Sequence, residues 1–244
     1  MVDSLKKKLT QDVQLKELLS GSAIVLVFKM LGAIASYVFF YLLAENWGAE
    51  GVGLFSLSFT LLGITVMISK LGLDGLIVKL IPEFKAKDQE GNERSVYKSL
   101  MTMVLLCSLF LSVAFYFLAE PLASIFQNDQ LEICFQFVAI AILPSVVLSM
   151  NAESLRALQM MRYFSYLQSG SVMLLSVLLL LFFRSLIDKG LATPIYVYLL
   201  ALIILCVISF FLLQNKFPST GNAKRPLALR STLKMSLPML ISGT

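Results

Sequence analysis

A long apolar stretch near the N-terminus carries a lysine in its interior. The run from Gly21 to Leu43 is long enough to cross a bilayer, because about 20 helical residues at 1.5 Å each cover roughly 30 Å of hydrocarbon. Lys29 lies about two helical turns inside this run. A charge at the centre of a span costs about 2.5–3.5 kcal/mol unless something relieves it. The stretch therefore predicts a membrane helix with protein or a cavity on one side.

The rest of the chain has the same apolar character. Of its 244 residues, 58% are hydrophobic and 14% are charged, whereas a soluble domain carries about 25% charged residues. The apolar runs are continuous, unlike the alternating segments of a membrane barrel. We therefore predict an all-α integral membrane protein, because helices satisfy their own backbone polar groups in lipid.

Several classes of chemistry lack the residues that they need. The chain has no histidine, and its three cysteines lie in apolar runs without a motif spacing. The lack of histidine therefore excludes histidine-based catalysis, and the cysteine spacing disfavours a zinc site. A nucleotide-binding glycine motif is also missing. We expect no enzymatic activity, no cofactor and no metal site.

Six apolar runs predict a six-helix transmembrane bundle over residues 21–213. The expected spans are 21–43, 52–71, 100–118, 131–151, 165–183 and 194–213. The flanking and connecting segments are expected to be an amphipathic cytoplasmic arm (1–20), a loop (44–51), an amphipathic surface segment (76–84), a cytoplasmic linker (214–233) and the start of a seventh span in a second bundle (234–244). The last two spans carry few polar groups, so we expect them at the lipid-facing periphery.

The basic residues give an orientation. The loops on one side hold 17 of the 20 lysines and arginines, and the loops on the other side hold Arg184 and Lys189. Because positive residues mark cytoplasmic loops, we expect the N-terminus and the linker in the cytoplasm. This bias also explains the net charge of +5 without nucleic-acid binding.

Two predicted spans carry a mixed polar face. Ser36 falls on the same helical face as Lys29, and Thr60 on the same face as Lys70. These faces could line a wet interior. Alternatively, their small residues could allow close helix packing, Lys29 could extend its side chain to the interface, and Lys70 could be an interfacial anchor.

Further polar residues gather near the cytoplasmic ends of the second and fourth spans. Asp74 and Lys79 could form a charge pair or be ordinary interfacial residues. Glu153 and Arg156 are three residues apart on a helix and could pair. Asn151 lies in the same stretch and is a further candidate for substrate binding.

A series of short motifs occurs in a characteristic order. These are Gly21, Lys29 with Leu31-Gly32, Gly48, Gly51, Gly53-Leu54-Phe55, Leu71-Gly72-Leu73 followed by Lys79, and the stretch from Pro144 through Asn151 to Leu155-Arg156-Ala157. In order and spacing they resemble the beginning of bacterial oligosaccharide-lipid flippases. These flippases are the polysaccharide-transporter branch of the multidrug/oligosaccharidyl-lipid/polysaccharide (MOP) superfamily.

The resemblance implies two six-helix bundles that face each other in a V, with this chain as the N-terminal one. It implies translocation of lipid-linked oligosaccharide, of the undecaprenyl-pyrophosphate type, across the bacterial cytoplasmic membrane by alternating access. Lys29 and Lys70 match positions that would bind the pyrophosphate, and Arg156 is a weaker candidate. Expected partners are the substrate, membrane lipid, and a polysaccharide polymerase or glycosyltransferases.

Two other functions stay open. A multidrug or organic-ion exporter of the same superfamily would more typically carry acidic residues inside its N-terminal bundle. A non-transporting membrane partner of the polysaccharide-assembly enzymes would need no charged cleft. Because the resembling family has about twelve to fourteen spans, we expect this chain to be an incomplete transporter.

Overall fold

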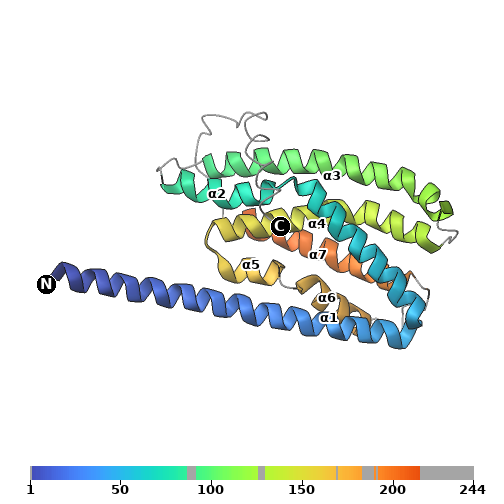
Figure 1. Ribbon diagram of the computed structural model, residues 1–244, viewed down its shortest axis with the longest axis horizontal. Coiled ribbons are helices and arrows are strands. Elements are labelled where there is room, and N and C mark those ends of the chain that lie inside the picture. The colour runs from blue at the N-terminus through green and yellow to red at the C-terminus, as the bar shows by residue number, and fades with distance from the viewer. Residues whose placement is uncertain are drawn as a thin grey trace.

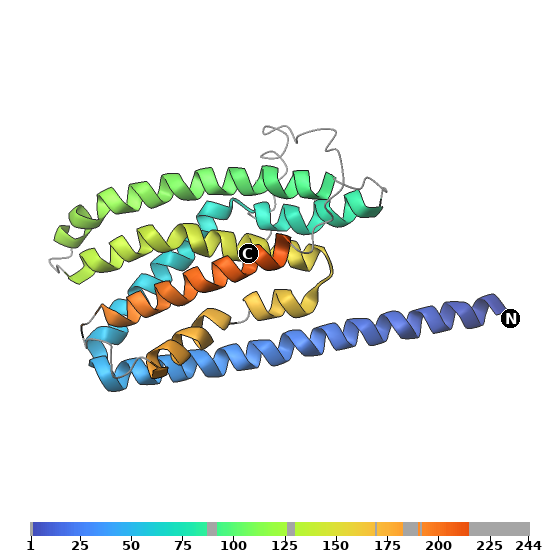
Figure 2. The same ribbon diagram turned by 180° about the vertical axis from the view of Figure 1, so that it is seen from behind.

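The computed structural model describes residues 2–86, 92–125, 130–168, 170–182, 190 and 192–214, with side chains from residue 22 onward except at 85, 86 and 92. This described part consists of helices and contains no strand, as predicted for an all-α protein. The helices lie lengthwise beside one another, and the N-terminal part of α1 projects beyond them (Figures 1 and 2). The predicted linker beyond Gln214, the segment 234–244, Arg184 and Lys189 lie outside the described residues.

Helix α1 (Val2–Lys70) contains both of the first two predicted spans. The loop expected at 44–51 is wrong, because only Gly48 leaves the helical conformation, with φ 65° and ψ −164°. An L-residue is strongly disfavoured in that region and glycine is not, so a single residue lets the chain turn back (Figure 1). Residues 2–20, expected as a separate arm, are helical and continuous with the first span.

Helix α2 (Leu73–Ala86) follows a break at Leu71 and Gly72, both of which have positive φ. It covers the amphipathic segment predicted at 76–84, and that prediction of a helix is confirmed. Its apolar face is covered by other helices and not, as expected, by lipid. Leu76, Ile77 and Ile81 are at most 2% exposed, because they pack against α3 (Asn92–Ile125) and α4 (Gln130–Ala157).

Helix α4 is the centre of the bundle and contacts α1, α2, α3, α5 and α7. Helix α7 (Thr193–Gln214) corresponds to the sixth predicted span, and its outer side is exposed as expected, with Leu200 and Val207 about half exposed. The ring of Tyr198 is buried in an aromatic cluster, with its centroid 5.6 Å from that of Phe55 and 6.1 Å from that of Phe137. One side of α7 therefore belongs to the core.

The fifth predicted span, 165–183, is broken in two. Helices α5 (Met161–Gln168) and α6 (Ser171–Phe182) meet at an angle of 55°. Gly170, which lies between them, has φ 81°. Within the described residues, four helices are long and apolar enough to cross a membrane, namely α1 from Ser22, α3, α4 and α7, and the bent α5–α6 pair makes a possible fifth.

Candidate functional site

Lys29 lies on the exposed side of α1. Leu26 and Ala33, which precede and follow it on the same helical face, are also exposed. Lys29 forms no ion pair or hydrogen bond with any residue that the structure describes. Its positive charge is therefore uncompensated within this part of the chain.

The neighbouring side of the same helix is closely packed. Phe28 makes an edge-to-face contact with Tyr166 of α5, with ring centroids 6.3 Å apart. Gly32 is buried against Gly170, where a Cβ added to Gly170 would lie 2.5 Å from the Gly32 Cα. Ser36 is half-buried, and its hydroxyl donates to the Gly32 carbonyl at 2.9 Å. The predicted polar face is thus divided between helix packing at Gly32 and Ser36 and open surface at Lys29.

The second half of α1 also exposes its predicted polar face. Thr60, Gly63 and Met67 are exposed, while Phe55 and Leu62 on the other side are buried in the core. The Thr60 hydroxyl donates to the Ser56 carbonyl at 2.8 Å, so it is satisfied within its own helix. Both halves of α1 therefore present small or polar residues away from the bundle.

Lys70 ends this face in a different environment from that of Lys29. Its Nζ lies 2.8 Å from Oδ2 of Asp74 and donates to the Ser149 hydroxyl at 3.3 Å. The other Asp74 oxygen, Oδ1, accepts a hydrogen bond from the Gly75 amide at 3.0 Å. Asp74 therefore pairs with Lys70 and not, as suggested, with Lys79, which is five residues along α2 and on a different side of that helix. The Lys70 charge is compensated and joins α1, α2 and α4.

A second ion pair lies near the end of α4. Nη1 of Arg156 is 3.5 Å from Oε2 of Glu153, which confirms the suggested pairing of these two residues. Glu153 is buried, at 8% exposure, whereas the Arg156 side chain is about half exposed. The Arg156 guanidinium also lies over the ring of Phe164 of α5, 5.3 Å from its centroid. Arg156 therefore has two partners within the bundle.

Asn151 is fully buried and bridges three helices. Its Oδ1 accepts a hydrogen bond from the Tyr97 hydroxyl of α3 at 2.6 Å, and its Nδ2 donates to the Ser209 hydroxyl of α7 at 2.9 Å. Contact with a substrate would require these helices to separate. The arrangement makes Asn151 a residue that holds α3, α4 and α7 together.

The sequence did not single out Tyr97, Ser149 or Ser209. Ser209 is a lone hydroxyl in an apolar run, and such a residue usually bonds to its own backbone, as Ser209 also does at 2.7 Å to the Cys206 carbonyl. Ser149 could have been predicted as a polar contact, because it lies one helical turn before Glu153 on the same face of α4.

The described residues contain no group of three or more metal-ligating side chains. The arrangement offers charge and hydrogen bonding but no assembled nucleophile and base. It can bind an anion at Lys29 more readily than at Lys70, because Lys70 is paired with Asp74 whereas Lys29 has no ion partner among the described residues.

Comparisons with known proteins place the chain in a family. No curated protein and no solved structure matches the chain. A model of the family described as "Polysaccharide biosynthesis protein" matches residues 18–244, which is nearly the whole chain. The chain therefore belongs to the polysaccharide biosynthesis protein family, the family of polysaccharide and O-antigen flippases of the MOP superfamily.

Proposed function

We propose that this protein translocates lipid-linked oligosaccharide, of the undecaprenyl-pyrophosphate type, across the bacterial cytoplasmic membrane by alternating access. Family membership supports a transporter in polysaccharide biosynthesis. The observation that carries the finer proposal is Lys29, an uncompensated cation on an exposed face within an apolar helix. That face would form one wall of a cleft between two bundles arranged in a V.

In this proposal α1 crosses the membrane twice. Its apolar part, Ser22–Lys70, has 49 residues, which at 1.5 Å each make a length of about 74 Å. The hydrocarbon core is only about 30 Å thick, and the chain turns back at Gly48 (Figure 2). With two crossings by α1 and one by the bent α5–α6 pair, the bundle has the six spans that we predicted.

The distribution of charges supports a cytoplasmic N-terminus. Six described basic residues belong to helix ends or to α2, which the proposal places on the cytoplasmic side, namely Lys70, Lys79, Arg94, Lys98, Arg156 and Arg162. The opposite helix ends carry Glu45, Glu50, Glu120 and Glu132 and no lysine or arginine among the described residues. Basic residues on one side are the usual mark of the cytoplasm.

The two lysines of α1 would play different parts. A pyrophosphate that leaves water must exchange its hydration for fixed charge and polar contacts, and Lys29 offers such a charge. Lys70 is already compensated by Asp74, so its part is to hold α1, α2 and α4 in place. As a point charge, Lys29 would bind the pyrophosphate without strict geometry, which suits a site that must also release it.

The experiment is complementation of a bacterium that lacks its own flippase. The wild-type protein should restore surface polysaccharide, and its Lys29→Glu variant should not. Lys79→Glu, which reverses an exposed charge on α2, is the matched control and should complement. If resistance to a cationic drug appears without polysaccharide, the protein is an exporter. If Lys29→Glu complements fully, the protein does not use a charged cleft and the proposal fails.

A further inference from the structure

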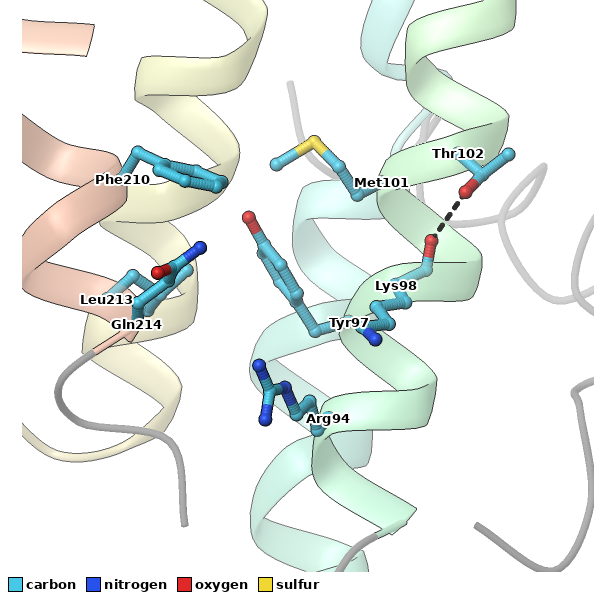
Figure 3. Close-up of a pocket in the computed structure, with 8 residues that line it drawn as sticks. All are labelled: Arg94, Tyr97, Lys98, Met101, Thr102, Phe210, Leu213 and Gln214. Atoms are coloured by element: carbon cyan, nitrogen blue, oxygen red, sulfur yellow. Dashed lines mark hydrogen bonds between the residues drawn. The ribbon is translucent and has the colours of Figure 1, made fainter. Parts of the chain in front are cut away.

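A cavity of about 320 Å³ lies between the start of α3 and the end of α7 (Figure 3). Helix α3 contributes Arg94, Lys98 and Met101 to its lining, and α7 contributes Phe210 and Leu213. Helix α1 contributes no lining residue, so this cavity is separate from the face that carries Lys29.

The outer part of the cavity is positively charged. Arg94 and Lys98 are one helical turn apart in the first two turns of α3, and both are exposed. Neither forms an ion pair with a residue that the structure describes. The lining contains no carboxylate. Among the described residues, the cavity therefore presents two cations that an anionic ligand could neutralise.

The inner part of the cavity is apolar. Met101 and Leu213 are 8% and 2% exposed, and Phe210 faces the cavity from α7 (Figure 3). The Tyr97 hydroxyl is engaged by Asn151, so the ring of Tyr97 acts as a wall and its polar end is not free. Along α3, the distance from Arg94 to Met101 is about 10 Å at helical rise. The lining thus changes from charged at the helix ends to apolar toward the middle of the helices.

We propose that this cavity binds an anionic phospholipid of the inner leaflet. The lipid phosphate would bind between Arg94 and Lys98, and an acyl chain would lie against Met101 and Phe210. Arginine binds a phosphate with two parallel hydrogen bonds, and basic pockets between membrane helices on the cytoplasmic side are known to bind acidic headgroups. A zwitterionic lipid fits less well, because its amine would find no carboxylate in the lining.

The test is a titration of the purified full-length protein with phosphatidylglycerol, with bound lipids counted by native mass spectrometry. The double variant R94A/K98A should weaken phosphatidylglycerol binding about tenfold or more, since each basic residue near an acidic membrane contributes about 1 kcal/mol. The matched control K79A/R162A removes two other exposed cations and should bind like the wild type. Met101→Trp, which fills the apolar part and keeps both charges, should also weaken binding.

Three results would overturn the proposal. The first is an equal loss for R94A/K98A and K79A/R162A, which would mean diffuse attraction to charge. The second is a lack of lipid selectivity. Equal binding of phosphatidylcholine would mean that the charge of the headgroup does not matter, and full competition by inorganic phosphate would mean that the acyl chain does not matter. The third is a preference for undecaprenyl pyrophosphate over phosphatidylglycerol, which would make the cavity part of the substrate path. Lys29→Ala should leave phosphatidylglycerol binding unchanged, so this test is independent of the proposed transport.

Discussion

Replacing Gly48 with alanine tests how the backbone conformation at the turn of α1 affects stability. A Cβ added at Gly48 meets nothing within 4 Å, and the same is true at Gly63. Gly63 lies in regular helix, whereas Gly48 has φ 65° and ψ −164°. The two substitutions therefore add the same methyl group to open space and differ only in the conformation of the backbone that receives it.

The expected effects have opposite signs. Alanine at Gly48 must adopt a region that is essentially limited to glycine, at a cost of about 1–3 kcal/mol. Alanine at Gly63 should stabilise the protein by up to about 1 kcal/mol through its higher helix propensity. Gly170→Ala should be the most harmful of the three, because it combines a positive φ with a Cβ 2.5 Å from the Gly32 Cα. Such overpacking adds about 1–3 kcal/mol to the strain.

Thermal unfolding in detergent micelles measures these differences. Cys134 is 0% exposed, so a thiol-reactive dye reports its release on unfolding once Cys107 and Cys206 are changed to serine. At about 2–4 °C per kcal/mol for a chain of this size, Gly48→Ala should lower the melting temperature by about 2–12 °C. Gly63→Ala should leave it unchanged or raise it. Equal melting temperatures for the two variants would refute the proposed conformation at Gly48.

Two further predictions concern the polar contacts between helices. Asn151→Leu should destabilise the protein by about 1–3 kcal/mol, because it removes the hydrogen bonds that the buried amide makes with the half-buried Tyr97 hydroxyl and the buried Ser209 hydroxyl. Tyr97→Phe, which removes one hydrogen bond at nearly constant volume, should cost about 0.5–1.5 kcal/mol in the same unfolding assay. Equal stability of Asn151→Leu and the wild type would contradict the network. The swap of Lys70 to aspartate with Asp74 to lysine should recover stability that either single change loses, and a double-mutant cycle with no coupling would exclude a contribution from this ion pair.

The apolar runs predicted most of the helices, because a membrane span is long and its hydrophobicity is continuous. Their partners were harder to predict. An apolar helix face has the same sequence pattern whether lipid or protein covers it. Leu76 and Ile81 of α2 were therefore expected at the membrane surface, but they are buried in the bundle. For the same reason α7 was expected at the periphery, although its Tyr198 is buried in the core.

Short backbone breaks caused the other differences. The polar stretch around Gly48 indicated an eight-residue loop, yet one glycine with positive φ is sufficient for the turn. The positive φ values at Leu71 and Gly72 end α1 directly after Lys70, and Asp74 at the start of α2 contacts that lysine and not Lys79. A sequence shows that glycine permits such a break, but the packing of the flanking helices selects which residue makes it.

The role of Lys29 remains a prediction. The most direct test measures the transbilayer movement of a fluorescent undecaprenyl-pyrophosphate-linked oligosaccharide in proteoliposomes. Wild-type protein should accelerate this movement. Lys29→Ala should slow it about tenfold or more, equivalent to about 1.4 kcal/mol of lost stabilisation, while Lys29→Arg and the control Lys79→Ala should keep most of the rate. Movement at the wild-type rate with Lys29→Ala would contradict the assignment of the pyrophosphate site to the exposed face of α1.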